Sequence, residues 1–151
     1  MKINIGQKAP DFELFDQSGN KLKLYNLLGT KSIVLFFYPK DNSPGCTREA
    51  CAFRDSYEIF QEQDTVVIGI SSDSEDSHKR FAEKQNLPYT LLSDKEGKVR
   101  KLFCVPKTMG FLPGRVTYII DKRGIVRHIF KSQLNFKGHI EEVLNVLKSM
   151  D

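Results

Sequence analysis

Two cysteines lie close together in residues 38–55, whose sequence is YPKDNSPGCTREACAFRD. Cys46 follows the pair Ser43-Pro44, and Cys51 comes five residues after it. Serine is a favoured N-cap and proline is favoured at the first helical position, so this pair predicts a helix with Cys46 in its first turn. The unpaired N–H groups and the helix dipole at that end favour a thiolate over a thiol. We therefore expect Cys46 to be a nucleophile rather than a small buried apolar residue.

The five-residue spacing between Cys46 and Cys51 limits how the two thiols can react together. Along a helix, five residues rise about 7.5 Å and rotate about 140° beyond a full turn. A disulfide needs Cα atoms within about 7 Å of each other and converging Cβ directions. The two cysteines can therefore bond only if the first helical turns unwind, and a helix end frays at little cost.

The elements that must position this helix alternate between strand and helix. Residues 32–38 and 65–71 are continuous apolar runs rich in β-branched and aromatic side chains, which is typical of strands covered on both faces. Apolar residues recur at helical spacing from about 44 to 63, which predicts one helix connecting two parallel strands. The loop that leads to Cys46 then lies at the carboxyl end of a strand, where open α/β sheets carry their catalytic loops.

The remaining patterns complete a thioredoxin-like α/β fold in a single domain of residues 1–151. The predicted elements are an N-terminal β-hairpin extension (12–24), a helix (76–85), a strand (89–93), a helical stretch (98–103), a β-hairpin (115–131) with its turn at 122–124, and an amphipathic C-terminal helix. The apolar stripe of that last helix comprises Ile140, Val143, Leu144, Val146, Leu147 and Met150. No linker or repeat divides the chain.

The composition narrows the classes of function. The chain has 151 residues, 40% of them hydrophobic, and its net charge of +4 comes from 23 basic and 19 acidic residues without a dense basic block. Nucleic acid is therefore not an expected partner. The longest apolar run, residues 33–38, is too short to span a membrane, and the N-terminus lacks the apolar region of a secretory signal. We expect a cytoplasmic protein with no membrane partner; a processed organelle form stays open, because a removed transit peptide leaves no trace.

The sequence has no pattern for a bound cofactor. Three cysteines in a reducing compartment favour redox or catalytic chemistry, or simple burial, over a disulfide scaffold, and they cannot complete an all-cysteine iron–sulfur site. The histidines His78, His128 and His139 have no metal-ligand spacing, and neither a Walker A nor a GxGxxG sequence is present. We expect neither a metal nor an organic cofactor.

The run FYPKDNSPGCTREACAFRD resembles the active-site signature of the peroxiredoxins. The second cysteine, five residues on, is similar to that of the peroxiredoxin Q, or bacterioferritin-comigratory, subfamily. The similarity extends over the stretches GQKAPDFELFDQSGN, LPYTLLSDKEGKVRKLF and GRVTYIIDKRGIVRHIF, nearly from end to end. The resemblance implies a thiol-dependent peroxidase that reduces hydrogen peroxide and organic hydroperoxides.

The same resemblance implies a role for five residues. Cys46 would be the peroxidatic cysteine, which peroxide oxidises to a sulfenic acid, and Cys51 the resolving cysteine, which then forms an intramolecular disulfide with it. Pro39 would shield the thiolate, and the Ser43 hydroxyl, where many members have threonine, would bond to the thiolate or the peroxide. Arg115 would hold the thiolate and the peroxide oxygens. Thioredoxin or a similar dithiol reductant would regenerate the enzyme, and because both cysteines lie in one helix, a monomer suffices.

Two other classes of function compete with this reading. A thioredoxin-fold disulfide reductase would need CxxC at the helix start, where this chain has Pro-Gly-Cys-Thr with a single cysteine. A peroxide-sensing or chaperone-like redox binding module would also use an activated cysteine and a partner thiol. Such a sensor has less need of a preorganised peroxide pocket, so the combination of Ser43, Cys46 and Arg115 favours an enzyme.

Three features near the active site have more than one interpretation. Cys104 is either a buried apolar residue, which its flanking residues favour, or an alternative resolving thiol. Arg48 and Glu49 either belong to a solvated helix face, which we favour, or form a salt-linked network near Cys46. The apolar loop of residues 105–114 either packs on the core or lines a site for lipid hydroperoxides or the reductant.

Overall fold

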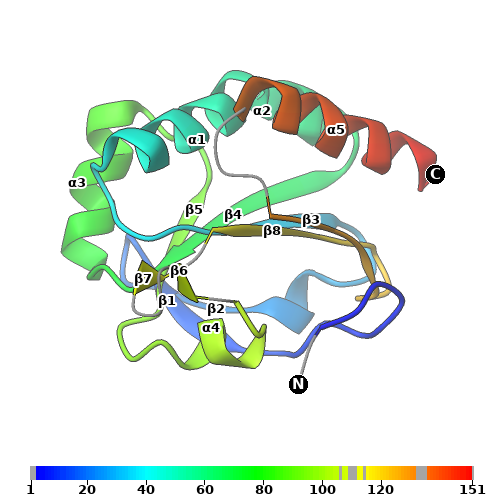
Figure 1. Cartoon of the computed structure of the whole chain (residues 1–151), viewed down its shortest axis with the longest axis horizontal. Helices are drawn as coiled ribbons and strands as arrows, with labels where there is room; N and C mark the ends of the chain where they lie inside the picture. The colour runs from blue at the N-terminus through cyan, green and yellow to red at the C-terminus, as the bar shows by residue number, and fades with distance from the viewer. Residues whose placement is uncertain (1–2, 106, 109–111, 114, 132–135, 151) are drawn as a thin grey trace.

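The computed structural model describes residues 3–105, 107–108, 112–113, 115–131 and 136–150 (Figure 1). A seven-stranded mixed sheet has the strand order β2-β1-β5-β4-β3-β8-β9. Its strands are β1 (Glu13–Asp16), β2 (Lys21–Lys23), β3 (Ser32–Phe37), β4 (Thr65–Ser71), β5 (Thr90–Ser93), β8 (Val116–Ile120) and β9 (Val126–Phe130). The expected N-terminal hairpin is β1–β2, and the expected second hairpin is β8–β9.

A second, two-stranded sheet pairs β6 (Lys107–Thr108) with β7 (Leu112–Pro113). The sequence pattern does not predict these two short strands. Half of the apolar loop expected at residues 105–114 lies outside the described residues, so both interpretations of this loop stay open.

Helices cover both faces of the large sheet (Figure 1). One face packs against α1 (Pro44–Asp55), α2 (Tyr57–Glu62), α3 (Glu75–Gln85) and α5 (Phe136–Ser149). The other face packs against α4 (Lys98–Leu102) and the 3-10 turn η1 (Leu24–Leu27). None of the helices in the described part of the chain is long and apolar enough to cross a membrane.

The central strand β3 explains why its sequence is apolar throughout. Val34 and Phe36 point into the core beneath α1 and α5, whereas Ile33 and Leu35 point into the core on the side of α4. Successive side chains of a strand alternate between the two faces, so a strand covered on both sides buries all of them. β3 is parallel to β4 and antiparallel to β8, which confirms the predicted strand–helix–strand unit.

The helix predicted over residues 44–63 is interrupted at Ser56, so the prediction of one continuous helix is wrong. Ser56 has φ −108° and ψ 8°, outside helical geometry, and it caps both α1 and α2. Phe53 of α1 and Phe60 of α2 are nevertheless both buried, with ring centroids 5.9 Å apart. The apolar spacing therefore continues across the break, which is why the spacing does not reveal it.

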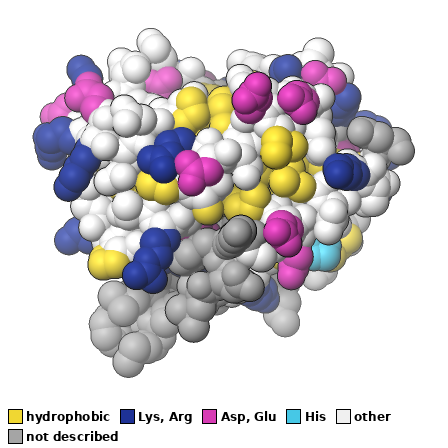
Figure 2. All heavy atoms as spheres, turned by 90° about the horizontal axis from the view of Figure 1, so that it is seen from above, with side chains coloured by type: hydrophobic (Ala, Val, Ile, Leu, Met, Phe, Trp, Pro, Cys, Tyr) yellow, Lys and Arg dark blue, Asp and Glu magenta, His cyan; other side chains and the backbone are white. Residues whose placement is uncertain are grey.

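The helical face also carries an apolar groove of about 550 Å³ between the α1–α2 junction and α5. Ala52, Ile59 and Leu144 line it, with Asp55 and Glu141 among its lining residues. Figure 2 looks onto this face and shows apolar side chains exposed between charged ones. The groove therefore lies beside the helix that carries both Cys46 and Cys51.

Candidate active site

The loop of residues 38–43 connects the carboxyl end of β3 to α1 and leads directly to Cys46. Ser43 is the N-cap and Pro44 the first residue of α1, so Cys46 lies in the first turn as predicted. Its side chain is only 1% exposed. The sulfur therefore belongs to a helix end whose first N–H groups have no partner within the helix, in a site from which most water is excluded.

Arg115 reaches Cys46 from the neighbouring strand. Its Nη2 lies 3.3 Å from the Cys46 Sγ, and the guanidinium is 9% exposed. Because Val116 pairs with Phe37 in the β3–β8 ladder, Arg115 lies beside the point where β3 ends and the catalytic loop begins. The structure thus brings together two predicted site residues that are 69 positions apart in the sequence.

Glu49 shares the same guanidinium, and the expectation of a solvated helix face is wrong for this residue. Its carboxyl is buried, 1% exposed, and Oε1 accepts a hydrogen bond from Arg115 Nη1 at 2.8 Å. Burial raises the pKa of Glu49 from 4.5 to about 7, against the lowering effect of Arg115. Burial lowers the pKa of Arg115, but the charges of Glu49 and Cys46 raise it overall. One cation therefore serves two acidic groups, and the carboxyl titrates near neutral pH.

Gly45 leaves room for this contact. A Cβ placed on Gly45 would lie 3.1 Å from Arg115 Nη2, closer than most Cβ contacts in proteins. A larger residue would therefore push the guanidinium away from Cys46. The sequence analysis did not single out Gly45; its only signal is the absence of a side chain next to the nucleophile.

Ser43 and Pro39 lie in the loop before the helix, both half-buried. The Ser43 hydroxyl donates to the carbonyl oxygen of Lys40 at 2.9 Å and makes no side-chain cap bond. Within the described residues, no hydrogen bond joins Ser43 to Cys46. Its hydroxyl would have to rotate away from Lys40 in order to donate to a thiolate or a peroxide.

Cys51 lies further along the intact helix, and none of the three cysteines of the chain is in a disulfide. Its half-buried thiol donates to Gln85 Oε1 at 3.5 Å, and burial raises the pKa of the thiol. Arg54 Nη1 donates to the Gln85 carbonyl at 2.7 Å, and the buried Tyr89 hydroxyl donates to the Ala50 carbonyl at 2.7 Å. These contacts hold the middle of α1 against the end of α3 and against Tyr89, which precedes β5.

Cys104 is not brought to this site. It follows α4, which covers the opposite face of the sheet, and it is half-buried rather than fully buried. The nearest hydrogen-bonding contact of its sulfur is the carbonyl oxygen of Leu102 at 3.9 Å. The geometry therefore favours Cys51 over Cys104 as the thiol that meets Cys46.

Comparisons with known proteins identify the family of this chain. Residues 5–129 match the sequence profile of the AhpC/TSA family. The chain is also 54% identical over 149 residues to the chloroplastic peroxiredoxin Q of Arabidopsis thaliana, with 98% of this chain and 68% of that protein covered. The chain belongs to the peroxiredoxin Q group of the AhpC/TSA family. It is a thiol-dependent peroxidase.

Solved peroxiredoxin structures confirm the thioredoxin-like fold. The peroxidoxin BcpB of Mycobacterium tuberculosis superimposes with a TM-score of 0.90 at 37% identity, covering 99% of each chain. The bacterioferritin comigratory protein of Xanthomonas campestris, known for alkyl peroxide reduction activity, superimposes with a TM-score of 0.85 at 29% identity over 92% of this chain and 91% of that one. Membership in the peroxiredoxins does not favour the alternative of a sensing or chaperone-like module.

Proposed function

We propose that Cys46 is the peroxidatic cysteine and that it reduces hydrogen peroxide and organic hydroperoxides. The observation that carries this proposal is the 3.3 Å contact between Arg115 Nη2 and the buried Cys46 sulfur in the first turn of α1. The alkyl peroxide reduction activity of the Xanthomonas relative supports the organic substrates. Pro39 would shield the sulfur, and Ser43 would turn its hydroxyl to the peroxide.

The first chemical step moves negative charge from sulfur to oxygen. The Cys46 thiolate attacks the terminal oxygen of ROOH, the S–O bond forms as the O–O bond breaks, and the alkoxide leaves and takes a proton to give ROH. Donors that are already in place along this path stabilise the moving charge. Arg115 supplies two of its fixed donors to Cys46 and Glu49, and arginine keeps its charge throughout.

Cys51 then resolves the sulfenic acid. Its thiol attacks the sulfenic sulfur of Cys46, a disulfide forms, and the oxygen leaves as water. Because the two cysteines lie five residues apart on α1, the first turns must unwind before this step. A thioredoxin-type dithiol then reduces the disulfide by exchange, as is general for peroxiredoxins.

The proposal also covers the domain organisation, the oligomeric state and the compartment of the protein. We infer one domain over residues 1–151 and a monomer, since both cysteines belong to one helix. Neither nucleic acid nor a membrane is expected as a partner. The reducing compartment is the cytoplasm or an organelle such as the chloroplast, the location named for the plant relative. Light scattering coupled to gel filtration tests the monomer directly.

Disulfide mapping tests the catalytic proposal. Reduced wild-type protein, Cys46→Ser and Cys51→Ser are each mixed with one equivalent of hydrogen peroxide and analysed as peptides by mass spectrometry. The proposal predicts a Cys46–Cys51 bond in the wild type, an oxidised Cys46 in Cys51→Ser, and no reaction in Cys46→Ser. A Cys46–Cys104 bond would move the resolving role, and a reduced wild-type Cys46 would overturn the proposal.

A further inference from the structure

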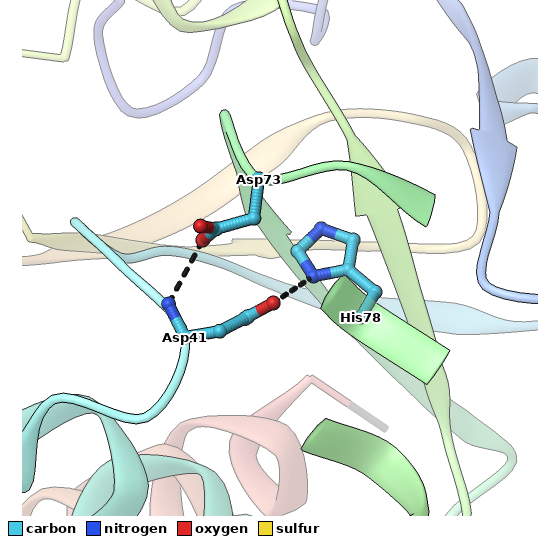
Figure 3. Close-up of side chains that lie close together, drawn as sticks. All are labelled: Asp41, Asp73 and His78. Carbon is cyan, nitrogen blue, oxygen red and sulfur yellow. Dashed lines mark hydrogen bonds and ion pairs between the residues drawn. The ribbon is translucent and has the colours of Figure 1, made fainter. Parts of the chain in front are cut away.

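Asp41 lies in the catalytic loop, five residues before Cys46, and its carboxylate is buried, 4% exposed. It receives three hydrogen bonds. The Tyr38 hydroxyl donates to Oδ1 at 2.7 Å, and the Ser77 hydroxyl donates to Oδ2 at 2.8 Å. His78 Nδ1 lies 2.7 Å from Oδ2, as Figure 3 shows. A carboxylate that accepts three donors is favoured in its ionised form.

The surroundings of His78 determine how many protons its ring carries. The ring is fully buried; Nδ1 faces the Asp41 carboxylate, and Nε2 lies 3.0 Å from the carbonyl oxygen of Leu92. Both neighbours are acceptors. A neutral imidazole has only one N–H and would leave the other nitrogen's lone pair against an oxygen. Because the Tyr38 and Ser77 hydroxyls also donate to Asp41 and favour its ionised form, the geometry points to a proton on each ring nitrogen, so that a buried imidazolium pairs with the Asp41 carboxylate.

Other charged groups lie around this pair. Asp73 follows β4 and lies beside both Asp41 and His78 (Figure 3), and Glu75 lies one turn before His78 on α3. Arg100, from α4, faces Asp73 and Asp94.

A metal ion is the competing explanation of this cluster. Ligand atoms of Asp41, Asp73 and His78 all lie within 4.8 Å of one another. Two ligands of one tetrahedral zinc lie roughly 3.3 Å apart, because each is about 2.0 Å from the metal. The 2.7 Å between His78 Nδ1 and Asp41 Oδ2 is instead the length of a charge-assisted hydrogen bond. Asp73 Oδ2 likewise accepts from the Asp41 N–H and from the Ser71 hydroxyl, so hydrogen bonds account for the contacts.

The backbone of the catalytic loop is also held from outside, on both sides of Pro39. Asp73 accepts the Asp41 N–H at 2.8 Å, and Arg100 Nη2 donates to the Tyr38 carbonyl at 3.1 Å. The next residue, Asn42, has φ +65°, a left-handed conformation that turns the chain into the helix start. The position of the first turn of α1 thus depends on where Asp41 is held.

We propose that His78 is a positioning residue for the peroxide reaction: its imidazolium holds Asp41, and through Asp41 it holds the loop of residues 38–43 in the shape that presents peroxide to Cys46. This inference rests on the proposed role of Cys46 and extends it to a residue on α3. His78 touches neither sulfur nor substrate. Its effect reaches Cys46 through the loop backbone.

Two reagents distinguish a positioning role of His78 from a general loss of structure in the variant. The rate of Cys46 oxidation by hydrogen peroxide depends on the shape of the loop, whereas alkylation of Cys46 by iodoacetamide depends on the thiolate and its access. For His78→Leu we expect the peroxide rate to fall about tenfold or more, since small misplacements carry large rate penalties, with less than about a threefold change in alkylation. His78→Asn keeps a donor for Asp41 and should recover part of the loss.

His139→Leu is the matched control, because His139 is also a buried histidine but contacts Thr117 of β8 instead of the catalytic loop. It should change both rates by less than about twofold, as expected for a residue outside the reaction path. Equal losses with both reagents in His78→Leu, or no loss with either, would overturn the inference. A wild-type protein that does not react with peroxide would instead overturn the proposed role of Cys46.

A measurement on the wild type keeps the inference testable even if His78→Leu does not fold. In protein labelled with ¹⁵N-histidine, NMR at neutral pH should show a proton on both Nδ1 and Nε2 of His78. The His139→Leu and His128→Asn variants assign the other two signals. A single N–H on His78 would contradict the imidazolium and with it the proposed anchor.

Discussion

The chain on the two sides of Asn42 is held in very different ways. Before it, Tyr38 and Asp41 are hydrogen-bonded by side chains from outside the loop: Asp73 after β4, His78 of α3 and Arg100 of α4. After it, within the described residues, the only side-chain hydrogen bond made by residues 44–48 joins Cys46 to Arg115. The loop that leads to Cys46 is thus firmly held, whereas the helix turn that carries Cys46, and that opens in the proposed cycle, has few side-chain hydrogen bonds beyond its own backbone.

This difference fits the order of steps in the proposed cycle. The peroxide step needs a fixed pocket, which the loop supplies. The resolving step needs the first turns of α1 to open, which the weak side-chain attachment allows. Ala50, Cys51 and Arg54 are held more tightly, by hydrogen bonds to Gln85 and Tyr89. Cys51 can reach Cys46 only after its own bond to Gln85 breaks.

The largest expected effect is that of Arg115→Met. The change removes the fixed donor to the Cys46 sulfur and leaves the buried Glu49 carboxyl without its cation. We expect the rate of Cys46 oxidation by hydrogen peroxide to fall by about 10²–10³, the range found when one such donor is removed. A competition assay against a second peroxidase measures this rate. Arg48→Met, at the exposed position two residues after Cys46, is the control, and equal rates in the two variants would contradict the assignment.

Gly45→Ala should have the next largest effect. The added Cβ would lie 3.1 Å from Arg115 Nη2, so the guanidinium or the helix turn must shift. We expect the peroxide rate to fall about tenfold, because a fixed donor is misplaced rather than removed. The same competition assay applies, with Thr47→Ala as the control in the same turn. A Gly45→Ala protein as fast as the wild type would show that Arg115 is not confined by this contact.

Tyr89→Phe should act on the opening of the helix rather than on the peroxide step. It removes the hydrogen bond from the buried hydroxyl to the Ala50 carbonyl, which contributes about 1 kcal/mol. Disulfide formation after oxidation should therefore become up to about fivefold faster, with the peroxide rate unchanged. Rapid quenching followed by mass spectrometry separates the two steps. Tyr57→Phe, at a half-buried tyrosine, is the control; a slower peroxide step in Tyr89→Phe would mean that Tyr89 supports the pocket instead.

The smallest effect is a pH dependence from His139, which packs from α5 against Phe53 of α1. Burial lowers the pKa of His139 from 6.5 in the folded protein. The folded state therefore binds the proton less readily than the unfolded chain, and the stability that His139 contributes is present above about pH 6.5 and lost as the pH falls below it. Urea unfolding of the wild type and of His139→Leu between pH 5 and 8 measures the free energy of unfolding at each pH. The same dependence of that free energy on pH in both proteins would contradict the prediction.

The sequence was sufficient to predict the features that depend on residues close together in the chain. The bounds of β3 and β4 follow from continuous apolar runs, and the place of Cys46 in the first turn follows from Ser43-Pro44. The break at Ser56 was not predictable, because Phe53 and Phe60 keep a helical spacing across it.

The residues that sequence reasoning missed all depend on distant partners. Glu49 reads as a helix-surface residue until Arg115, 66 positions away, is placed beside it. His78 shows no metal-ligand spacing, and its partner Asp41 lies 37 positions earlier in the chain. One sequence read by itself carries no signal for such pairs, since neither residue type nor spacing indicates which charged residues will be buried together.

Hydrogen exchange measured by mass spectrometry tests the central claim most directly: the loop before Asn42 stays in place while the helix after it opens. Reduced protein and protein oxidised by one equivalent of hydrogen peroxide are compared peptide by peptide. The account predicts that oxidation speeds exchange of the amides of residues 46–52 and leaves those of residues 38–41 unchanged. Faster exchange on both sides of Asn42, or on neither, would contradict it.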